Sequence, residues 1–210
     1  MSKRIALFGG SFDPPHLGHQ ALVDAAFEYL ELDEIWVIPV GLPVHRQLSG
    51  RATAKQRLTW LAAMFAHEPR VHIVNWEINQ AKPSPAIATL RRFQAENPNV
   101  IPIWLMGFDS FLSMPKWVEY PKHQMLCNLA VFQRNNHKST LETNGWKTSP
   151  HIRQHTSPGH VTFINKALAD ISATQIRQKP ELHQKDLHQD TCNAILACYA
   201  SAEFNKERTT

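Results

Sequence analysis

Two glycines and two histidines near the start of the chain form the residue pattern best suited to chemistry. The string GGSFDPPHLGH occupies residues 9–19 and follows a short apolar run. Its glycines leave the backbone bare, and the first N–H groups of a following helix lack partners, so the turn favours an anion such as phosphate. His16 and His19 share one face of a helix that begins near Pro15. A tight turn with two ordinary surface histidines is the alternative, but the agreement of these signals favours a phosphate site.

Three further groups of candidates follow predicted strands, where doubly wound sheets bind their ligands. His45 and Arg46 could hold a second anionic substrate, or could belong to an ordinary surface loop. Asp109 could accept hydrogen bonds from a ribose, or could cap the next helix. Trp117 could stack on a planar ring, or could belong to the core.

A second helix start lies in the string ISATQIR, residues 171–177. Ser172 and Gln175 have the spacing of a capping box, which predicts a helix whose first amides face solvent or a ligand. Arg177 then projects from the second turn, near the positive end of the helix dipole. Together with Thr174, these residues predict a clamp for a polyphosphate.

Apolar strands alternate with amphipathic helices along the chain. This predicts an α/β fold with a doubly wound parallel sheet covered on both faces, and a small helical C-terminal part. The predicted strands are residues 5–8, 35–39, 71–74, 101–106, 129–132 and 161–164. The predicted helices follow the glycine turn up to residue 30, and then cover residues 53–67, 86–95 and 190–200.

The chain is predicted to form a single domain over residues 1–201. The polar segment 135–160 lacks a clear period and is predicted to be a loop excursion. Its four histidines match no common metal-ligand spacing, so solvated loop histidines are favoured over a zinc site. Residues 202–210 are predicted to be a frayed tail.

Composition restricts the class of protein and of ligand. The formal charge is +4 and the pI is near 9.1, yet no basic run exceeds two residues, which favours small anions over nucleic acid. The three cysteines form no C-x-x-C pair, which is typical of reduced thiols. With no signal peptide or long apolar run, we expect a soluble cytoplasmic protein without a membrane partner. The oligomeric state stays open, a homo-oligomer included.

The two terminal strings together resemble the H-x-G-H nucleotidylyltransferase superfamily, whose second signature is I-S-S-T-x-x-R. The segments PVHR at 43–46, MGFDS at 106–110 and PKW at 115–117 make the chain similar to the bacterial nicotinate-nucleotide adenylyltransferases within it. The resemblance runs in the same order from Lys3 to about Arg177. It implies a Rossmann-like nucleotidylyltransferase fold, and the formation of nicotinate adenine dinucleotide from nicotinate mononucleotide and ATP with Mg²⁺, on the way to NAD.

The resemblance also implies roles for individual residues. His16, His19 and Arg177 are the expected catalytic groups, at the ATP phosphates. Further contacts to ATP are expected from Gly9, Gly10, Ser11, Phe12, Gly18, Asp109, Ile171 and Ser172. Contacts to the mononucleotide are expected from Asp13, His45, Arg46, Trp117 and Arg134.

The chemistry that these residues can perform agrees with this assignment. No candidate serine or cysteine nucleophile is paired with a base, so we expect direct in-line attack of the mononucleotide 5′-phosphate on the α-phosphorus of ATP. The residues then act by positioning and by neutralising charge. No carboxylate pair has metal-ligand spacing, so Mg²⁺ is expected to be held by ATP itself.

The chain departs from the family pattern in one segment. Ser84-Pro85-Ala86 stands where the family has Ser-Tyr-Thr, and Gln80 stands where an arginine is common. This segment helps the family recognise the pyridine ring, so transfer to nicotinamide mononucleotide is the nearest rival. A phosphopantetheine-specific member is disfavoured, because such chains tend to be shorter and lack the G-x-D-S and P-x-W block. A divergent paralogue that binds nucleotides without turnover is the rival from another functional class.

Overall fold

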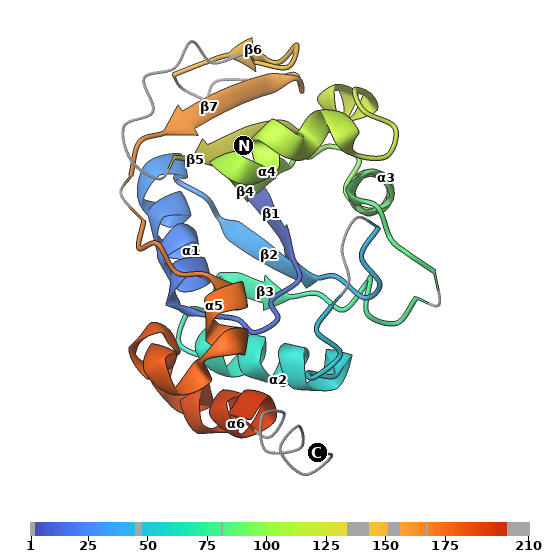
Figure 1. Ribbon diagram of the computed structural model, residues 1–210. Coiled ribbons are helices and arrows are strands. Elements are labelled where there is room, and N and C mark those ends of the chain that lie inside the picture. Colours follow the sequence, from blue (N-terminus) through green and yellow to red (C-terminus); the bar gives the residue numbers. More distant parts are fainter. Residues whose placement is uncertain are drawn as a thin grey trace.

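A seven-stranded sheet with helices on both faces forms the centre of the computed structural model (Figure 1). The structure describes residues 3–44, 48–80, 82–133, 143–150, 156–166 and 168–200. The strands are β1 (Ile5–Gly10), β2 (Glu34–Pro39), β3 (Val71–Ile73), β4 (Ile103–Gly107), β5 (Asn128–Phe132), β6 (Lys147–Thr148) and β7 (His160–Ile164). The α-helices are α1 (Leu17–Leu30), α2 (Ala54–Met64), α3 (Ala86–Glu96), α4 (Phe108–Ser113), α5 (Ala173–Gln178) and α6 (Gln189–Ala200). Short 3-10 helices are η1 (Met114–Lys116), η2 (Lys122–Met125) and η4 (Pro180–Asp186).

The order of the strands reverses at β1, which points to a ligand site at the carboxyl end of this strand. All recorded strand pairs are parallel, and the order is β3-β2-β1-β4-β5-β7-β6. The chain builds outward from β1 to β3 and then returns to the other side of β1 as β4. The β1–β4 pairing joins Ala6 to Ile103 and Leu7 to Trp104, so it stops before the carboxyl end of β1. Open α/β sheets bind ligands at such a reversal, and the predicted doubly wound parallel sheet is confirmed.

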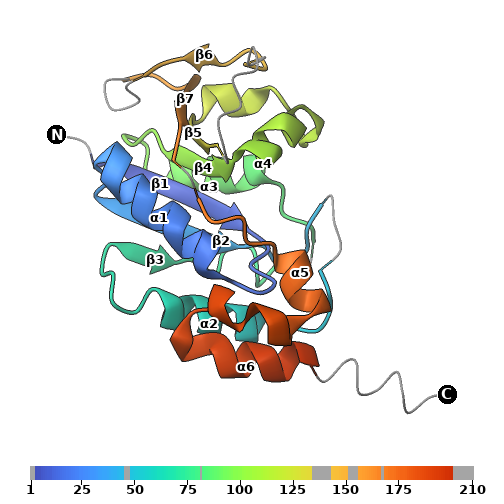
Figure 2. The ribbon, with the colours of Figure 1, turned by 60° about the vertical axis from the view of Figure 1, so that its left-hand side comes forward.

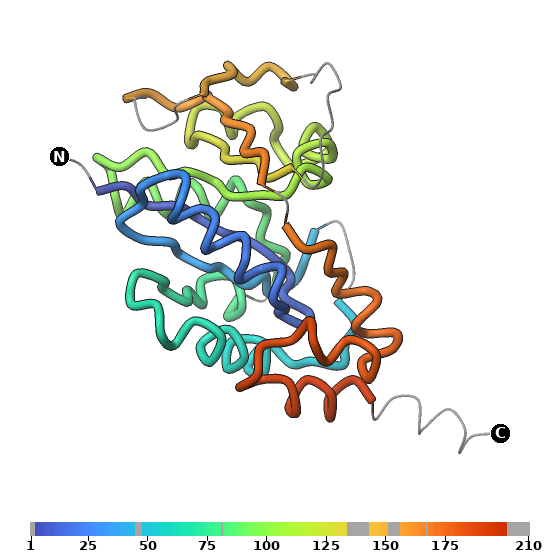
Figure 3. The backbone as a smooth tube through the Cα atoms, turned by 90° about the vertical axis from the view of Figure 1, so that its left-hand side faces the viewer, coloured from blue at the N-terminus to red at the C-terminus, as the bar shows by residue number. Residues whose placement is uncertain are grey.

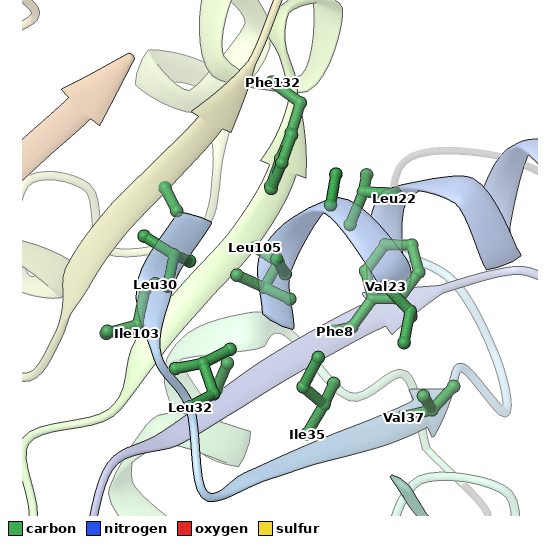
Figure 4. Packing of buried hydrophobic residues seen from close by; sticks show 14 of the residues in the cluster. Phe8, Leu22, Val23, Leu30, Leu32, Ile35, Val37, Ile103, Leu105 and Phe132 are labelled. Atoms are coloured by element: carbon green, nitrogen blue, oxygen red, sulfur yellow. The ribbon is translucent and has the colours of Figure 1, made fainter. Parts of the chain in front are cut away.

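Alternate residues of β1 belong to two separate cores. Ala6 and Phe8 pack with α1 and α2 on one face, where aliphatic side chains surround a few phenylalanines (Figure 4). Ile5 and Leu7 point the other way and pack with α3 and α4. A strand buried on both faces reads as a continuous apolar run, which is why the sequence identified the central strands.

The helices after β7 form a third apolar cluster. Ile176 of α5 and Ile195 and Tyr199 of α6 pack around Trp60 of α2. Figures 2 and 3 show α5 and α6 beside α2, on the opposite side of the molecule from β6 and β7. This cluster is the small helical C-terminal part predicted from the sequence, and it brings the end of the chain close to the loop after β1.

Most predicted elements lie within two or three residues of their observed bounds, and β6 is the main difference. The sequence predicted a loop excursion over residues 135–160, but Lys147 and Thr148 pair with β7 at the edge of the sheet. Trp146, directly before them, is 2% exposed and belongs to the core. A two-residue strand has too little periodicity to be recognised in the sequence.

Within the described ranges, no helix is both long enough and apolar enough to cross a membrane.

Candidate active site

The loop after β1 is shaped by aromatic packing. A Cβ atom on Gly9 would lie 2.8 Å from Cζ2 of Trp104, and one on Gly10 would lie 2.9 Å from Cζ of Phe12. The glycines are therefore needed so that two rings can lie against the strand, whereas we had expected them to make room for phosphate oxygens. Phe12 is buried and has a φ of +46°, in the left-handed region that bulky residues rarely occupy. Backbone held in such a conformation is typical of functional loops.

The two histidines lie together at the start of α1, as predicted. The helix begins at Leu17 rather than near Pro15, with His16 as its N-cap and His19 in its first turn. Their ring centroids are 3.8 Å apart. The backbone N–H of His16 donates a hydrogen bond to Nδ1 of His19 at 3.1 Å. A neutral imidazole carries one N–H, so an accepting Nδ1 leaves the proton on Nε2, which can donate to a phosphate oxygen.

Gly18 lies where the first sequence motif meets the second. A Cβ atom at this position would lie 3.0 Å from Nδ1 of His16 and 3.5 Å from Cβ of Ile171. A side chain here would crowd the buried His16 ring, whereas Ile171 lies at an ordinary contact distance. Ile171 therefore lies beside the first turn of α1, next to Gly18 and in the same cluster as Leu17.

Arg177 approaches the same loop from α5. Its Nη1 donates to the backbone carbonyl of Asp13 at 2.7 Å, and its Nη2 donates to Oγ1 of Thr174 at 3.0 Å. Ser172 is the N-cap of α5, as predicted, but its side chain makes no capping hydrogen bond in the helix described, so the predicted capping box with Gln175 is wrong. The first turn is instead closed through the backbone, where the N–H of Ile176 donates to the carbonyl of Ser172 at 3.0 Å.

Asp13 lies inside the protein at the base of this loop. It is 3% exposed, and its carboxylate accepts hydrogen bonds from the backbone N–H and the hydroxyl of Ser49 and from the hydroxyl of Tyr199. In this conformation both of its carboxylate oxygens are engaged by the protein. These contacts hold the loop, and a direct contact of Asp13 with a mononucleotide stays a prediction.

A buried guanidinium fixes the remaining loop backbone. Arg57 of α2 is 1% exposed, and its Nη1 donates to the carbonyl of Ser11 at 2.7 Å and to that of Val40, after β2, at 2.8 Å. Burial lowers the pKa of Arg57, while attraction to Asp13 and Tyr199 raises it. Arg57 thus joins the loop after β1 to the residue that follows β2.

The backbone at the end of β4 is open at Gly107. A Cβ atom built on Gly107 would meet no described atom within 4 Å. Asp109 is exposed in the first turn of α4, whose N-cap is Gly107. The alternative that Asp109 caps this helix is therefore wrong, and its carboxylate stands at the carboxyl edge of the sheet, where a ribose contact was predicted.

Trp117 lies between the core and the surface. Its ring is half-buried, 6.4 Å from that of Trp104 and 5.9 Å from that of His123, measured between centroids. His123 is itself buried, which lowers its pKa to about 4. The sequence left open whether Trp117 stacks on a ligand or belongs to the core. One part of the indole packs on the core, and the rest is accessible for stacking.

The other predicted mononucleotide contacts, His45, Arg46 and Arg134, lie outside the described residues. Their roles stay predictions.

The divergent segment forms the start of α3. Pro85 is the N-cap of this helix and Ser84 is buried. Thr89, one turn further along, donates a hydrogen bond to the carboxyl group of Glu77. Glu77 is 5% exposed, and burial raises its pKa to about 7 although the hydrogen bond from Thr89 lowers it.

The sequence did not indicate the residues that support the site. Four such residues contact the loop after β1 or Arg177: Ser49, Arg51, Arg57 and Tyr199. All four are 36 to 186 residues away from Asp13 in the sequence, and no motif singles them out. A buried arginine within an amphipathic helix is the one signal that could have been noticed, because an apolar face rarely contains an unpaired cation.

Among the described residues, no group of three or more His, Cys, Asp or Glu side chains could hold a metal ion.

Comparisons with known proteins agree with this geometry. A family model described as cytidylyltransferase-like matches residues 7–179. A relative from Shewanella frigidimarina, named a probable nicotinate-nucleotide adenylyltransferase, is 32% identical over 188 residues, which cover 84% of this chain and 87% of the relative. A protein of the same name from Chromobacterium violaceum is 37% identical over 135 residues, 64% of each chain.

Solved structures show the same fold. The nicotinic acid mononucleotide adenylyltransferase of Plasmodium falciparum, complexed with NaAD, superimposes with a TM-score of 0.74 and 18% identity over 94% of this chain and 96% of that one. A putative nicotinate-nucleotide adenylyltransferase from Vibrio parahaemolyticus gives a TM-score of 0.62 at 16% identity, over 93% and 99% of the two chains.

The parallel sheet, its reversal at β1 and the paired histidines define a nucleotidyltransferase of the cytidylyltransferase-like class. Within that class, the chain belongs to the nicotinate-nucleotide adenylyltransferase family.

Proposed function

We propose that this enzyme transfers the adenylyl group of ATP to nicotinate mononucleotide, giving nicotinate adenine dinucleotide and pyrophosphate in NAD biosynthesis. The names of its bacterial relatives support this activity, as does the NaAD bound to the Plasmodium falciparum neighbour. The observation that carries the proposal is that the loop after β1 ends in the histidine pair of α1 and also accepts a hydrogen bond from Arg177 of α5.

The reaction requires no covalent enzyme intermediate. An oxygen of the mononucleotide 5′-phosphate forms a bond to the α-phosphorus of ATP. The bond from that phosphorus to the oxygen bridging to the β-phosphorus breaks, and its electron pair leaves with pyrophosphate. The attacking phosphate is already anionic, so no strong general base is needed. We assign to His16, His19 and Arg177 the stabilisation of the negative charge that develops on the α-phosphoryl group and on pyrophosphate.

Contacts with the adenosine part of ATP are assigned to the neighbouring loop and helix starts. Contacts to ATP are assigned to the backbone of Gly9, Gly10, Ser11 and Phe12, together with Gly18. Asp109 is assigned to the ribose, and its exposure beside the open space at Gly107 supports this. Ile171 and Ser172 are assigned to the adenine and triphosphate side, and the position of Ile171 beside Gly18 supports this.

The mononucleotide is assigned to the other side of the loop. The half-buried ring of Trp117 supports a stacking contact with the pyridine ring. His45, Arg46 and Arg134 complete this side in the proposal by attracting the carboxylate or phosphate groups of the substrate.

ATP-dependent transfer of this kind uses a divalent cation, and we assign Mg²⁺ to that role. Imidazoles dominate the described site, whereas Mg²⁺ prefers oxygen ligands. This donor set suits an ion that enters with the ATP phosphates and shields their charge. The single-domain organisation and the cytoplasmic location inferred from the sequence belong to the same proposal.

The first experiment compares the two pyridine mononucleotides. Pyrophosphate release from ATP is measured with nicotinate or nicotinamide mononucleotide at matched concentrations, with Mg²⁺ and then with excess EDTA. Release with the acid alone, or a strong preference for it, together with loss in EDTA, is the expected result. Ser84-Pro85-Ala86 would then recognise the carboxylate through backbone N–H groups near the start of α3.

Two other outcomes would replace the proposal. A preference for the amide would assign the sister activity, which the altered Ser84-Pro85-Ala86 segment favours. Binding of ATP without pyrophosphate release from either substrate would assign a nucleotide-binding protein without turnover.

A further inference from the structure

A buried network joins the last helix of the chain to the loop after β1. Tyr199 of α6 is fully buried, and its hydroxyl donates a hydrogen bond to Oδ1 of Asp13. The same oxygen accepts a hydrogen bond from Oγ of Ser49 at 3.0 Å, and Oδ2 accepts one from the backbone N–H of Ser49 at 2.7 Å. Three donors from two distant segments therefore fix the orientation of one carboxylate.

The carboxylate is connected to Arg177 through the backbone of its own residue. The carbonyl oxygen of Asp13 accepts the hydrogen bond from Nη1 of Arg177 at 2.7 Å. Its position depends on how the side chain of Asp13 is held, because the two groups share one Cα atom. Among contacts of the described residues, Asp13 and Thr174 occupy two of the five N–H donors of this guanidinium. The group thus keeps donors for an anion while its direction is set by the protein.

Arg51 makes a second link between Arg177 and α6. Its Nη1 donates to the backbone carbonyl of Arg177 at 3.0 Å and to that of Tyr199 at 3.2 Å. The side chain of Arg177 is therefore oriented through Asp13, and its backbone is held through Arg51. Both links end on Tyr199, which makes this residue the common anchor of the network.

The hydrogen bond between Tyr199 and Asp13 is buried, so losing it would be costly. Burial and the hydrogen bond to Asp13 raise the pKa of Tyr199, so its hydroxyl stays protonated and donates. The charge of Asp13 is balanced in part by Arg57, whose pKa it raises. A buried carboxylate that loses one of its donors must find another or move toward water. Removing the Tyr199 hydroxyl should therefore shift Asp13 and the carbonyl that orients Arg177.

We propose that Tyr199 and Asp13 are positioning residues, which orient the Arg177 guanidinium toward the phosphates through the Tyr199–Asp13–Arg177 hydrogen-bond chain. The inference rests on the proposed function in one respect, the assignment of Arg177 to the ATP phosphates. It gives the C-terminal helix a part in the reaction, although none of its residues is expected to touch a substrate.

The test compares two variants that each remove one buried hydroxyl from α6. Tyr199→Phe deletes the donor to Asp13 and keeps the ring against Trp60. Thr191→Val is the matched control, because Thr191 is 1% exposed and its hydroxyl donates to the carbonyl of His188, outside the network. We expect kcat per active site to fall about tenfold in Tyr199→Phe, with the KM for the mononucleotide unchanged. The control should stay within about twofold of the parent enzyme. An equal fall of kcat in both variants would mean that Tyr199 contributes only to packing, and the proposal would be overturned.

A double-mutant cycle separates positioning from general damage. Tyr199→Phe is made in an Arg177→Ala background, where there is no guanidinium left to orient. We expect almost no further loss of kcat there, within about twofold. The same tenfold loss in both backgrounds would mean that Tyr199 acts independently of Arg177, and the proposal would fail.

A binding measurement keeps the test independent of turnover. The dissociation constant of ATP is measured by calorimetry for the same four proteins, and a weakening of about threefold by Tyr199→Phe is expected only where Arg177 is present. If the parent enzyme binds ATP but transfers to neither mononucleotide, the proposed function fails while this cycle still decides the positioning role.

Should Tyr199→Phe not fold, Ser49→Ala removes another donor to the same Asp13 oxygen and must show the same dependence on Arg177.

Discussion

At the scale of single residues, the histidine pair is the best-defined reactive feature of the molecule. The rings lie 3.8 Å apart, and the backbone N–H of His16 sets the tautomer of His19 by donating to its Nδ1. The ring of Phe12 packs against that of His19 at a centroid distance of 4.9 Å. Each imidazole is thus oriented before any ligand arrives, which is the condition for stabilising charge that appears only in the transition state.

This arrangement predicts that His19→Ala lowers the rate far more than the affinity. We expect kcat to fall by about 10²- to 10³-fold, as for the loss of one preorganised donor, while the dissociation constant of ATP rises by less than about tenfold. Steady-state kinetics and calorimetry with the same preparations measure the two quantities. His67→Ala, at an exposed position outside the site, is the control. Equal losses of rate and affinity would remove the catalytic role of His19.

At the scale of elements, α3 is joined to the segment after β3 by a buried pair. Thr89 of α3 donates to Glu77, and a Cβ atom on Gly41 would lie 2.1 Å from the carbonyl oxygen of Glu77. The segment around residue 77 therefore contacts both α3 and the loop after β2. In the sequence, the loop after β2 continues into His45 and Arg46, and α3 begins at Ser84-Pro85-Ala86. The segment around Glu77 therefore contacts both elements that are assigned to the mononucleotide.

The raised pKa of Glu77 makes stability depend on pH. Its pKa is about 7 in the folded protein against 4.5 for the free group, so the folded state binds the proton more strongly. As the pH rises from 4.5 to 7, the unfolded chain loses this proton first, and the free energy of unfolding falls by up to roughly 3 kcal/mol. The difference between the parent protein and Glu77→Gln, measured by urea unfolding from pH 5 to 8, should follow this change.

The control for this measurement is Glu96→Gln, at an exposed position of α3, the helix that Glu77 contacts through Thr89. Its difference from the parent protein should change little over the same pH range. A pH-independent difference for Glu77→Gln as well would contradict the raised pKa.

At the scale of the whole molecule, the site lies between two packing units. The sheet and its first helices supply the loop after β1, and the C-terminal cluster supplies Arg177 (Figure 2). ATP held by the histidine pair and by Arg177 would bridge these units. A ligand that binds only the folded state stabilises everything it holds together.

This arrangement predicts that ATP stabilises α5 and α6 as well as the loop. At free ATP about 100 times its dissociation constant, the free energy of unfolding should rise by about 2.7 kcal/mol, and hydrogen exchange should slow in residues 173–200. In Arg177→Ala, at ATP adjusted to the same saturation, protection should persist near residues 9–19 and disappear from the C-terminal helices. Unchanged protection of these helices in the variant would show that Arg177 does not join the two units.

The sequence by itself determined the class of fold and the main chemical motifs. Continuous apolar runs such as residues 5–8 identified the central strands, because a strand buried on both faces leaves no polar alternation. The i, i+3 spacing of His16 and His19 predicted their shared face, and Ser172 predicted the start of α5. These features depend on the backbone within one or two turns, so neighbouring residues are sufficient to specify them.

Only the tertiary structure decided how the site is supported. Asp13 is bound by Ser49 and Tyr199, Gly9 is required by Trp104, and β6 exists through its pairing with β7. Such partners are distant in the sequence, and no local preference selects them. They are chosen when packing removes water from a polar group, which must then bond to whichever donor the fold brings within reach.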